Sequence, residues 1–151
     1  MRLQDAIKTE RFRNTRHMAT LNLLYTAYWF KSHNNLLLKD FDLTSEQYNV
    51  LRILRGKHPE PMCVKDIGSR MLEKSSNVPR IIDRLVLKKL VKRATSKEDK
   101  RETITTVTPE GLRVLESASK AMDKDADRLI GITEEEASQL NELLEKLRTK
   151  D

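Results

Sequence analysis

Residues 64–108 read VKDIGSRMLEKSSNVPRIIDRLVLKKLVKRATSKEDKRETITTVT, and their pattern is the strongest indication of the fold. Apolar residues recur at helical spacing over 64–72 and again over 78–85, with a short polar turn between the two runs. β-Branched residues then dominate 91–95 and 103–107, on either side of a charged turn. The order helix, tight turn, helix and two-stranded hairpin predicts a winged helix-turn-helix.

The chain before this stretch is predicted to be helical. Apolar residues at three- and four-residue steps indicate one long helix over 15–34, and residues 36–41 are expected to form a short apolar connection. Thr44 and Gln47 have the spacing of a capping box, so a further helix is expected to begin after Thr44.

Two more helices are predicted after the hairpin. Thr108 and Pro109 indicate a helix start, because threonine caps the first turn and proline is favoured inside it. Thr133 and Glu136 repeat the capping-box spacing before a last amphipathic helix. The apolar stripe of that helix consists of Leu140, Leu143, Leu144 and Leu147. The predicted fold class is therefore mainly α, a winged helix-turn-helix with a small two- or three-stranded β wing between N- and C-terminal helices.

Composition excludes several classes of protein. The 151 residues include four glycines and four prolines, too few for a sheet-rich fold with many turns. No apolar run approaches the roughly 20 residues that cross a bilayer. The N-terminus becomes polar at once, and the single cysteine cannot form an internal disulfide. A cytoplasmic protein is therefore expected.

The net charge of +6 is concentrated in one segment. Residues 64–101 hold twelve of the 29 Lys and Arg residues and five of the 23 Asp and Glu residues, so their balance is +7 and that of the remaining residues is −1. Dispersed lysines would indicate only solubility, whereas this clustering indicates a surface that binds phosphates. Double-stranded DNA is the predicted partner.

The second helix of the pair has an outward face suited to DNA. Short polar residues at the start of a recognition helix reach base edges, and Arg80 has the geometry to bridge the O6 and N7 atoms of a guanine in the major groove. The residues predicted to contact DNA here are Ser75, Ser76, Asn77, Arg80 and Arg84, with Lys88, Lys92 and Arg93 on the DNA backbone. The alternative is an ordinary solvated helix face.

The hairpin tip supplies a second group of candidates, Lys97, Asp99, Lys100 and Arg101. A narrow minor groove attracts an inserted arginine, and Arg101 is predicted to take this role. The alternative is a solvated turn.

Several motifs of this region resemble the MarR (multiple antibiotic resistance regulator) family of winged helix-turn-helix transcriptional regulators. They are Asp99-Lys100-Arg101, Thr108-Pro109-Glu110-Gly111, and Arg84-Leu85 followed by Leu90-Val91-Lys92-Arg93. The order of elements is similar over nearly the whole chain. The resemblance implies a single domain over 1–151, with dimerisation helices at 1–35 and 109–151 and a DNA-binding part at 44–108.

The resemblance also implies a function. It implies a homodimer whose recognition helices enter successive major grooves of a pseudo-palindromic operator, more often as a repressor than as an activator. It further implies that Asp99 orients a nearby arginine at the base of the wing while Arg101 enters the minor groove. The competing hypothesis is a winged helix that binds an acidic protein and no specific DNA.

One position departs from the family pattern. The family usually has glycine between the recognition helix and the first wing strand, where this sequence has Lys89. A non-glycine residue with positive φ costs on the order of 1 kcal/mol, so the helix is expected to end differently here.

Members of the family often lose DNA affinity on binding a small aromatic or anionic ligand. The residues that the resemblance places near such a ligand are Tyr25, Tyr28, Trp29, Tyr48 and Arg52, and the alternative is that these side chains belong to the core. Cys63, the only thiol, is expected to be a buried structural cysteine. The histidines lack metal-ligand spacing, and phosphate-binding and catalytic motifs are absent, so no cofactor and no enzyme activity are expected.

Overall fold

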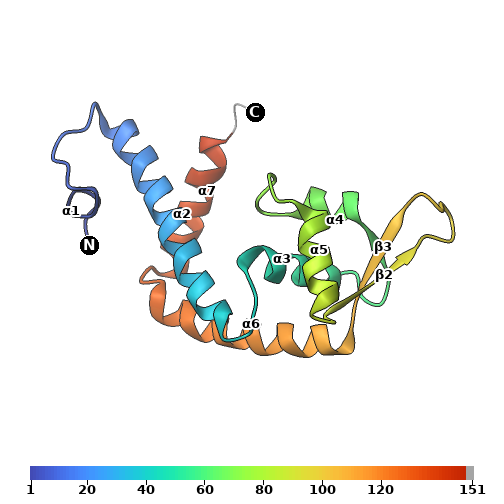
Figure 1. The fold of residues 1–151 in the computed structure, drawn as a ribbon. Helices are drawn as coiled ribbons and strands as arrows, with labels where there is room; N and C mark the ends of the chain where they lie inside the picture. The colour runs from blue at the N-terminus through green and yellow to red at the C-terminus, as the bar shows by residue number, and fades with distance from the viewer. Residues whose placement is uncertain (149–151) are drawn as a thin grey trace. The chain divides into compact units, whose positions relative to one another are not determined.

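The computed structural model describes residues 1–148, and Figure 1 labels its helices and strands along the chain. In order they are α1 (Leu3–Ile7), α2 (Thr15–Lys39), α3 (Ser45–Arg55), β1 (Met62–Cys63), α4 (Val64–Arg70), α5 (Val78–Leu87), β2 (Val91–Thr95), β3 (Thr103–Val107), α6 (Pro109–Leu129) and α7 (Glu134–Leu147). The chain divides into two compact units, one over residues 1–118 and one from residue 119 onward. Helix α6 begins in the first unit and continues into the second.

Helix α2 is longer than the sequence predicted. It continues to Lys39, so the apolar connection expected over 36–41 is wrong for most of its length. Leu38 is buried at 1% exposure while Leu36 is exposed, which is the pattern of one more helical turn and not of an extended link. The helix closes at Asp42, whose φ of 51° is left-handed.

The predicted capping box opens α3. The Gln47 backbone N–H donates to Thr44 Oγ1, and the Thr44 backbone N–H donates to the Gln47 side-chain oxygen, each at 3.2 Å. The core behind it comes from three helices, with Val50, Leu51, Leu54, Ile67, Ile82 and Leu85 at most 1% exposed. Each such side chain contributes about 1.5–3 kcal/mol by leaving water, so α3, α4 and α5 hold one another in place.

The sheet has three antiparallel strands in the order β1-β3-β2. Strands β2 and β3 pair from Val91↔Val107 to Thr95↔Thr103, over the two segments that the sequence predicted. Strand β1 adds only two pairs to β3, including Met62↔Thr105. The structure thus confirms a mainly helical winged helix-turn-helix, with three strands in the sheet that residues 1–148 form.

The joint between α5 and β2 closes in the left-handed conformation. Lys89 has φ 60°, its N–H donates to the Val86 carbonyl at 2.9 Å, and the Leu90 N–H donates to the Leu85 carbonyl at 3.0 Å. These bonds form a Schellman motif, which usually has glycine at the left-handed position. The expectation of a different helix end is therefore wrong: burial of Leu85 and Leu90 stabilises the usual ending, and Lys89 adopts the strained conformation.

The first turn of α6 packs against this joint. Thr108 Oγ1 donates a shared hydrogen bond to the Lys89 and Leu90 carbonyls (2.8 and 3.0 Å) and accepts one from the Gly111 N–H (3.0 Å). A Cβ atom on Gly111 would lie 2.1 Å from the Leu90 carbonyl oxygen, so this approach requires glycine.

The second unit carries the last predicted helix. The Thr133 capping box opens α7 as predicted, with the Thr133 N–H donating to Glu136 at 2.8 Å. Leu140, Leu143 and Leu147 of its apolar stripe are nevertheless exposed, and none of its described residues is buried. In the described part of the chain, no helix is both long and apolar enough to cross a membrane.

Candidate DNA interface

The N-terminal end of α5 is built by Asn77. The Arg80 backbone N–H donates to Asn77 Oδ1 at 3.3 Å, so Asn77 is the cap among the three polar residues that precede the helix. Ser75 and Asn77 are exposed. Ser76 is half-buried, and its hydroxyl oxygen is buried without a hydrogen-bond partner in the described structure. Two of the three side chains predicted to face DNA at this end are therefore accessible.

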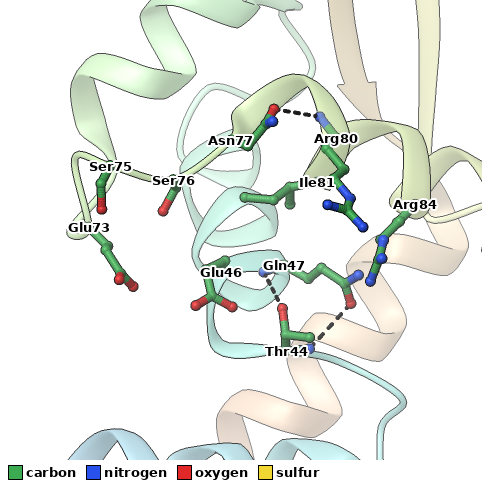
Figure 2. Close-up of a pocket in the computed structure, with 10 residues that line it drawn as sticks. All are labelled: Thr44, Glu46, Gln47, Glu73, Ser75, Ser76, Asn77, Arg80, Ile81 and Arg84. Carbon is green, nitrogen blue, oxygen red and sulfur yellow. Dashed lines mark hydrogen bonds between the residues drawn. The ribbon is translucent and has the colours of Figure 1, made fainter. Parts of the chain in front are cut away.

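Two arginines of α5 lie outside its buried stripe. Val78, Ile82 and Leu85 are buried on one side of the helix, whereas Arg80 and Arg84 are exposed. Figure 2 shows both arginine side chains on the same side of α5, lining a pocket of about 300 Å³ together with Asn77 and residues of α3. The side of α5 that borders this pocket thus carries two guanidinium groups and short polar groups, and that this side contacts DNA stays a prediction.

Two carboxylates border the same pocket, and Lys31 of α2 holds both. Its Nζ lies 2.8 Å from Glu73 Oε2 and 3.5 Å from Glu46 Oε1. The hydrogen bond that Lys31 donates to the Glu73 carboxylate is the main cause that raises the pKa of Lys31. Burial alone would raise the pKa of Glu46, but hydrogen bonds from backbone and Thr44 and the charge of Lys31 lower it. The positive charge of Lys31 therefore partly offsets the negative charges of Glu46 and Glu73, which lie in the same pocket as the arginines.

Two of the basic residues predicted for the DNA backbone are already paired within the chain. Arg93 Nη2 lies 2.5 Å from Asp83 Oδ1, which joins β2 to α5. Lys88 Nζ lies 3.1 Å from Asp42 Oδ2, so this ammonium group faces the turn between α2 and α3. Lys92 is exposed on β2.

The wing tip is a closed turn with charged side chains outside. The backbone N–H groups of Glu98 and Asp99 donate to Ser96 Oγ (3.2 and 3.3 Å), and the Arg101 N–H donates to Asp99 Oδ1 at 2.9 Å. The Asp99 carboxylate therefore holds the backbone of Arg101, and its predicted role in orienting an arginine side chain at the base of the wing stays a prediction. Exposed basic side chains surround the turn, namely Lys97, Lys100 and Arg101.

The five residues predicted near an effector fall into two groups. Tyr25 and Trp29 line a pocket of about 290 Å³ between α1 and α2, and Tyr28 is 71% exposed. Tyr48 and Arg52 contact each other on α3, with the guanidinium carbon 5.9 Å from the ring centre. The pocket lined by Tyr25 and Trp29 is not lined by Tyr48 or Arg52.

Cys63 lies in β1 and is half-buried, so it is less enclosed than the sequence suggested. No group of His, Cys, Asp and Glu side chains able to hold a metal ion occurs among residues 1–148.

Comparison with known proteins places these features in a family. Residues 43–103 match the MarR family. A solved MarR transcription factor from Planctomyces limnophilus is 30% identical, with 92% of this chain and 99% of that chain covered and a TM-score of 0.70. The chain belongs to the MarR family. It is thus a DNA-binding transcriptional regulator with a winged helix-turn-helix, and not an enzyme.

Two further proteins are similar to this chain over most of their length. The transcriptional regulator MhqR of Bacillus subtilis (strain 168) is 27% identical over 116 residues, which cover 76% of this chain and 79% of MhqR. The structure of the S. aureus MepR–DNA complex has a TM-score of 0.78 at 22% identity and covers 87% of this chain and 97% of that one. At this identity, the MepR likeness shows the fold.

Proposed function

We propose that this MarR-family chain is a homodimer that binds a pseudo-palindromic site in double-stranded DNA through α5 and the wing. The observation that carries the proposal is that exposed Arg80 and Arg84 extend from one face of α5, within the segment that holds the whole positive excess. Such a surface attracts phosphates, and arginine has the bidentate geometry that guanine requires. The relative MepR was crystallised with DNA, which supports the proposal.

The homodimer is proposed from exposed apolar side chains near both ends of the chain. They include Leu24, Tyr28, Ile130, Ile132, Leu140, Leu143 and Leu147. Leu140, Leu143 and Leu147 recur at helical spacing on α7, and an exposed apolar helix face is typical of an interaction site that a second copy offers in return. In this proposal, residues 1–35 and 109–151 dimerise and residues 44–108 bind DNA.

The test is a salt series on duplex DNA of random sequence, followed by selection of bound sites from a random pool. A phosphate-binding surface loses affinity steeply as salt rises, and selected sites report half-site spacing. Arg80→Ala with Arg84→Ala should weaken binding, whereas Arg128→Ala, outside the basic segment, should not. Absence of binding at about 50 mM salt contradicts the proposal and favours an acidic protein partner.

We further propose that the protein is a repressor and that a small aromatic or anionic ligand releases it. The pocket lined by Tyr25 and Trp29 supports an aromatic ligand. An aromatic acid such as salicylate should raise the melting temperature and lower operator affinity. If it changes neither quantity, the proposal of this ligand class fails. A cytoplasmic location stays a prediction.

A further inference from the structure

The last turn of α5 has a lysine that faces the protein. Lys88 Nζ donates to Gln47 Oε1 at 3.2 Å and to the backbone carbonyl of Asp42, and it lies 3.1 Å from Asp42 Oδ2. An ammonium group has three N–H donors, and here three acceptors surround it. The Lys88 side chain is 27% exposed, whereas Lys92 is among the exposed residues.

The Gln47 side-chain oxygen and the Asp42 backbone carbonyl belong to a fixed part of the fold, whereas the Asp42 carboxylate is on an 87% exposed side chain. Gln47 is 3% exposed and is already held by the Thr44 backbone N–H in the capping box, so its oxygen has a defined position. Asp42 lies in the left-handed conformation that ends α2, with the Leu43 N–H donating to the Leu38 carbonyl at 3.0 Å. Leu38 and Leu43 are both buried in the core, which holds this turn in place.

The ends of α2 and α5 therefore share one construction. Each is closed by the hydrogen bonds of a Schellman motif, and each has a non-glycine residue, Asp42 or Lys89, at the left-handed position. Lys88 connects the two ends. Since β2 follows α5 directly, a movement of this joint would displace the recognition helix and the wing together.

We propose that Lys88 is a positioning residue of the DNA interface, which holds the C-terminal end of α5 against the turn between α2 and α3 and does not bind a DNA phosphate. The inference rests on the proposed DNA binding. Two roles of a lysine differ in a measurable way. A phosphate contact contributes equally to all sequences and adds about one unit to the salt slope, whereas a positioning contact alters how well base-reading side chains fit.

The experiment compares Lys88→Gln with the matched variant Lys92→Gln, each measured on the selected operator and on random duplex over a salt series. Lys92→Gln should lower the affinity for both duplexes by the same factor and lower the salt slope of binding by about one unit. Lys88→Gln should leave the random-duplex slope unchanged and reduce the operator-to-random affinity ratio by about five- to thirtyfold. Lys88→Arg, which keeps a cation that reaches Asp42, should restore most of the ratio.

A second variant keeps the test valid if Lys88→Gln unfolds. Asp42→Asn retains the backbone carbonyl and suits the left-handed conformation, so the fold should survive. It should lower the operator-to-random ratio in the same direction, by a smaller factor, and without a change in salt slope. Circular dichroism and the melting temperature check that each variant is folded.

Several outcomes overturn the inference. If Lys88→Gln lowers the salt slope by about one unit and lowers the affinity for both duplexes by the same factor, Lys88 binds phosphate. If Asp42→Asn raises the affinity for both duplexes by the same factor, the Lys88–Asp42 pair affects DNA binding only through long-range charge. If the unmodified protein binds no duplex, the proposed function itself fails, and the inference fails with it.

Discussion

Helices α5 and α7 carry the same kind of apolar stripe, yet α5 buries its stripe and α7 exposes its own. Ile82 and Leu85 of α5 are 0% exposed, whereas Leu143 and Leu147 of α7 are 63% and 60% exposed. Both helices have a polar side chain as N-cap, Asn77 and Thr133, so local signals do not separate them. The two helices differ in what packs against them, because α3 and α4 cover the apolar stripe of α5 within the winged helix.

The comparison teaches that amphipathic pattern predicts a helix but not what covers it. The winged helix is complete within one chain, because its core side chains are almost inaccessible. The apolar face of α7 requires another surface, and the proposed homodimer provides one. The variants below act on one of these two regions and spare the other.

The largest effect is expected from Leu143→Glu combined with Leu147→Glu. Each leucine that leaves an interface costs about 1.5–3 kcal/mol, and a buried carboxylate adds to that cost. We expect a monomer in light scattering, with helical content of the winged helix retained. Glu142→Gln on the same helix is the control and should stay dimeric. A dimer in the double variant would place the interface elsewhere.

Gly111→Ala is expected to destabilise the winged helix, where the first turn of α6 packs against the joint between α5 and β2. The added Cβ atom would lie 2.1 Å from the Leu90 carbonyl oxygen and 2.9 Å from a methyl group of Val107, so backbone must move. We expect the free energy of unfolding to fall by about 3 kcal/mol in denaturant titrations. Gly131→Ala is the matched control, because no atom outside Gly131 and its two chain neighbours lies within 4 Å of the added Cβ. Equal effects of the two changes would show that the contact at Gly111 relaxes without cost.

Arg80→Ala changes the exposed side of α5 and leaves its buried stripe intact. Loss of a bidentate guanine contact costs about 1–3 kcal/mol at one base pair, so preference at that position should relax. Repeating the site selection with the variant measures this directly. Lys92→Ala should lower the affinity for all DNA sequences by a similar factor. An unchanged selected motif after Arg80→Ala would remove this arginine from base recognition.

The smallest effect is expected from Lys89→Gly. Lys89 has φ 60°, and glycine relieves a strain of about 1 kcal/mol there, partly offset by the greater freedom of glycine in the unfolded chain. The free energy of unfolding should therefore rise by a fraction of 1 kcal/mol. Lys89→Ala keeps the Cβ atom and the strain, so it should show no such gain. A loss of stability on Lys89→Gly would mean that the lysine side chain itself stabilises the joint.

Much of the fold followed from local signals. Thr44 and Thr133 placed two helix starts through capping boxes, and β-branched residues placed both hairpin strands at their observed bounds. Strand β1 was not predictable, because two residues show no alternation and Met62 becomes a strand residue only by pairing with Thr105. The end of α2 was missed because burial of Leu38 decides it.

The candidate site divides in the same way. The outward direction of Arg80 and Arg84 follows from the helical period, so sequence alone indicated it. The pairs Lys31–Glu73 and Lys88–Asp42 join residues 42 and 46 positions apart, and no periodic pattern connects such residues. Which basic residues of the segment are available to DNA is therefore a property of the folded chain.

The contact of Thr108 and Gly111 with the end of α5 has a consequence for how an operator can change. Thr108 Oγ1 accepts a hydrogen bond from the Gly111 N–H and donates to the Lys89 and Leu90 carbonyls, so it ties the start of α6 to the joint between α5 and β2. We therefore expect α5 and the wing to turn together as one body. The distance along DNA between a base read by Arg80 and the groove reached by the wing is then a constant of the monomer. Operators in related genomes should accordingly vary in the spacer between half-sites and keep the length of each half-site.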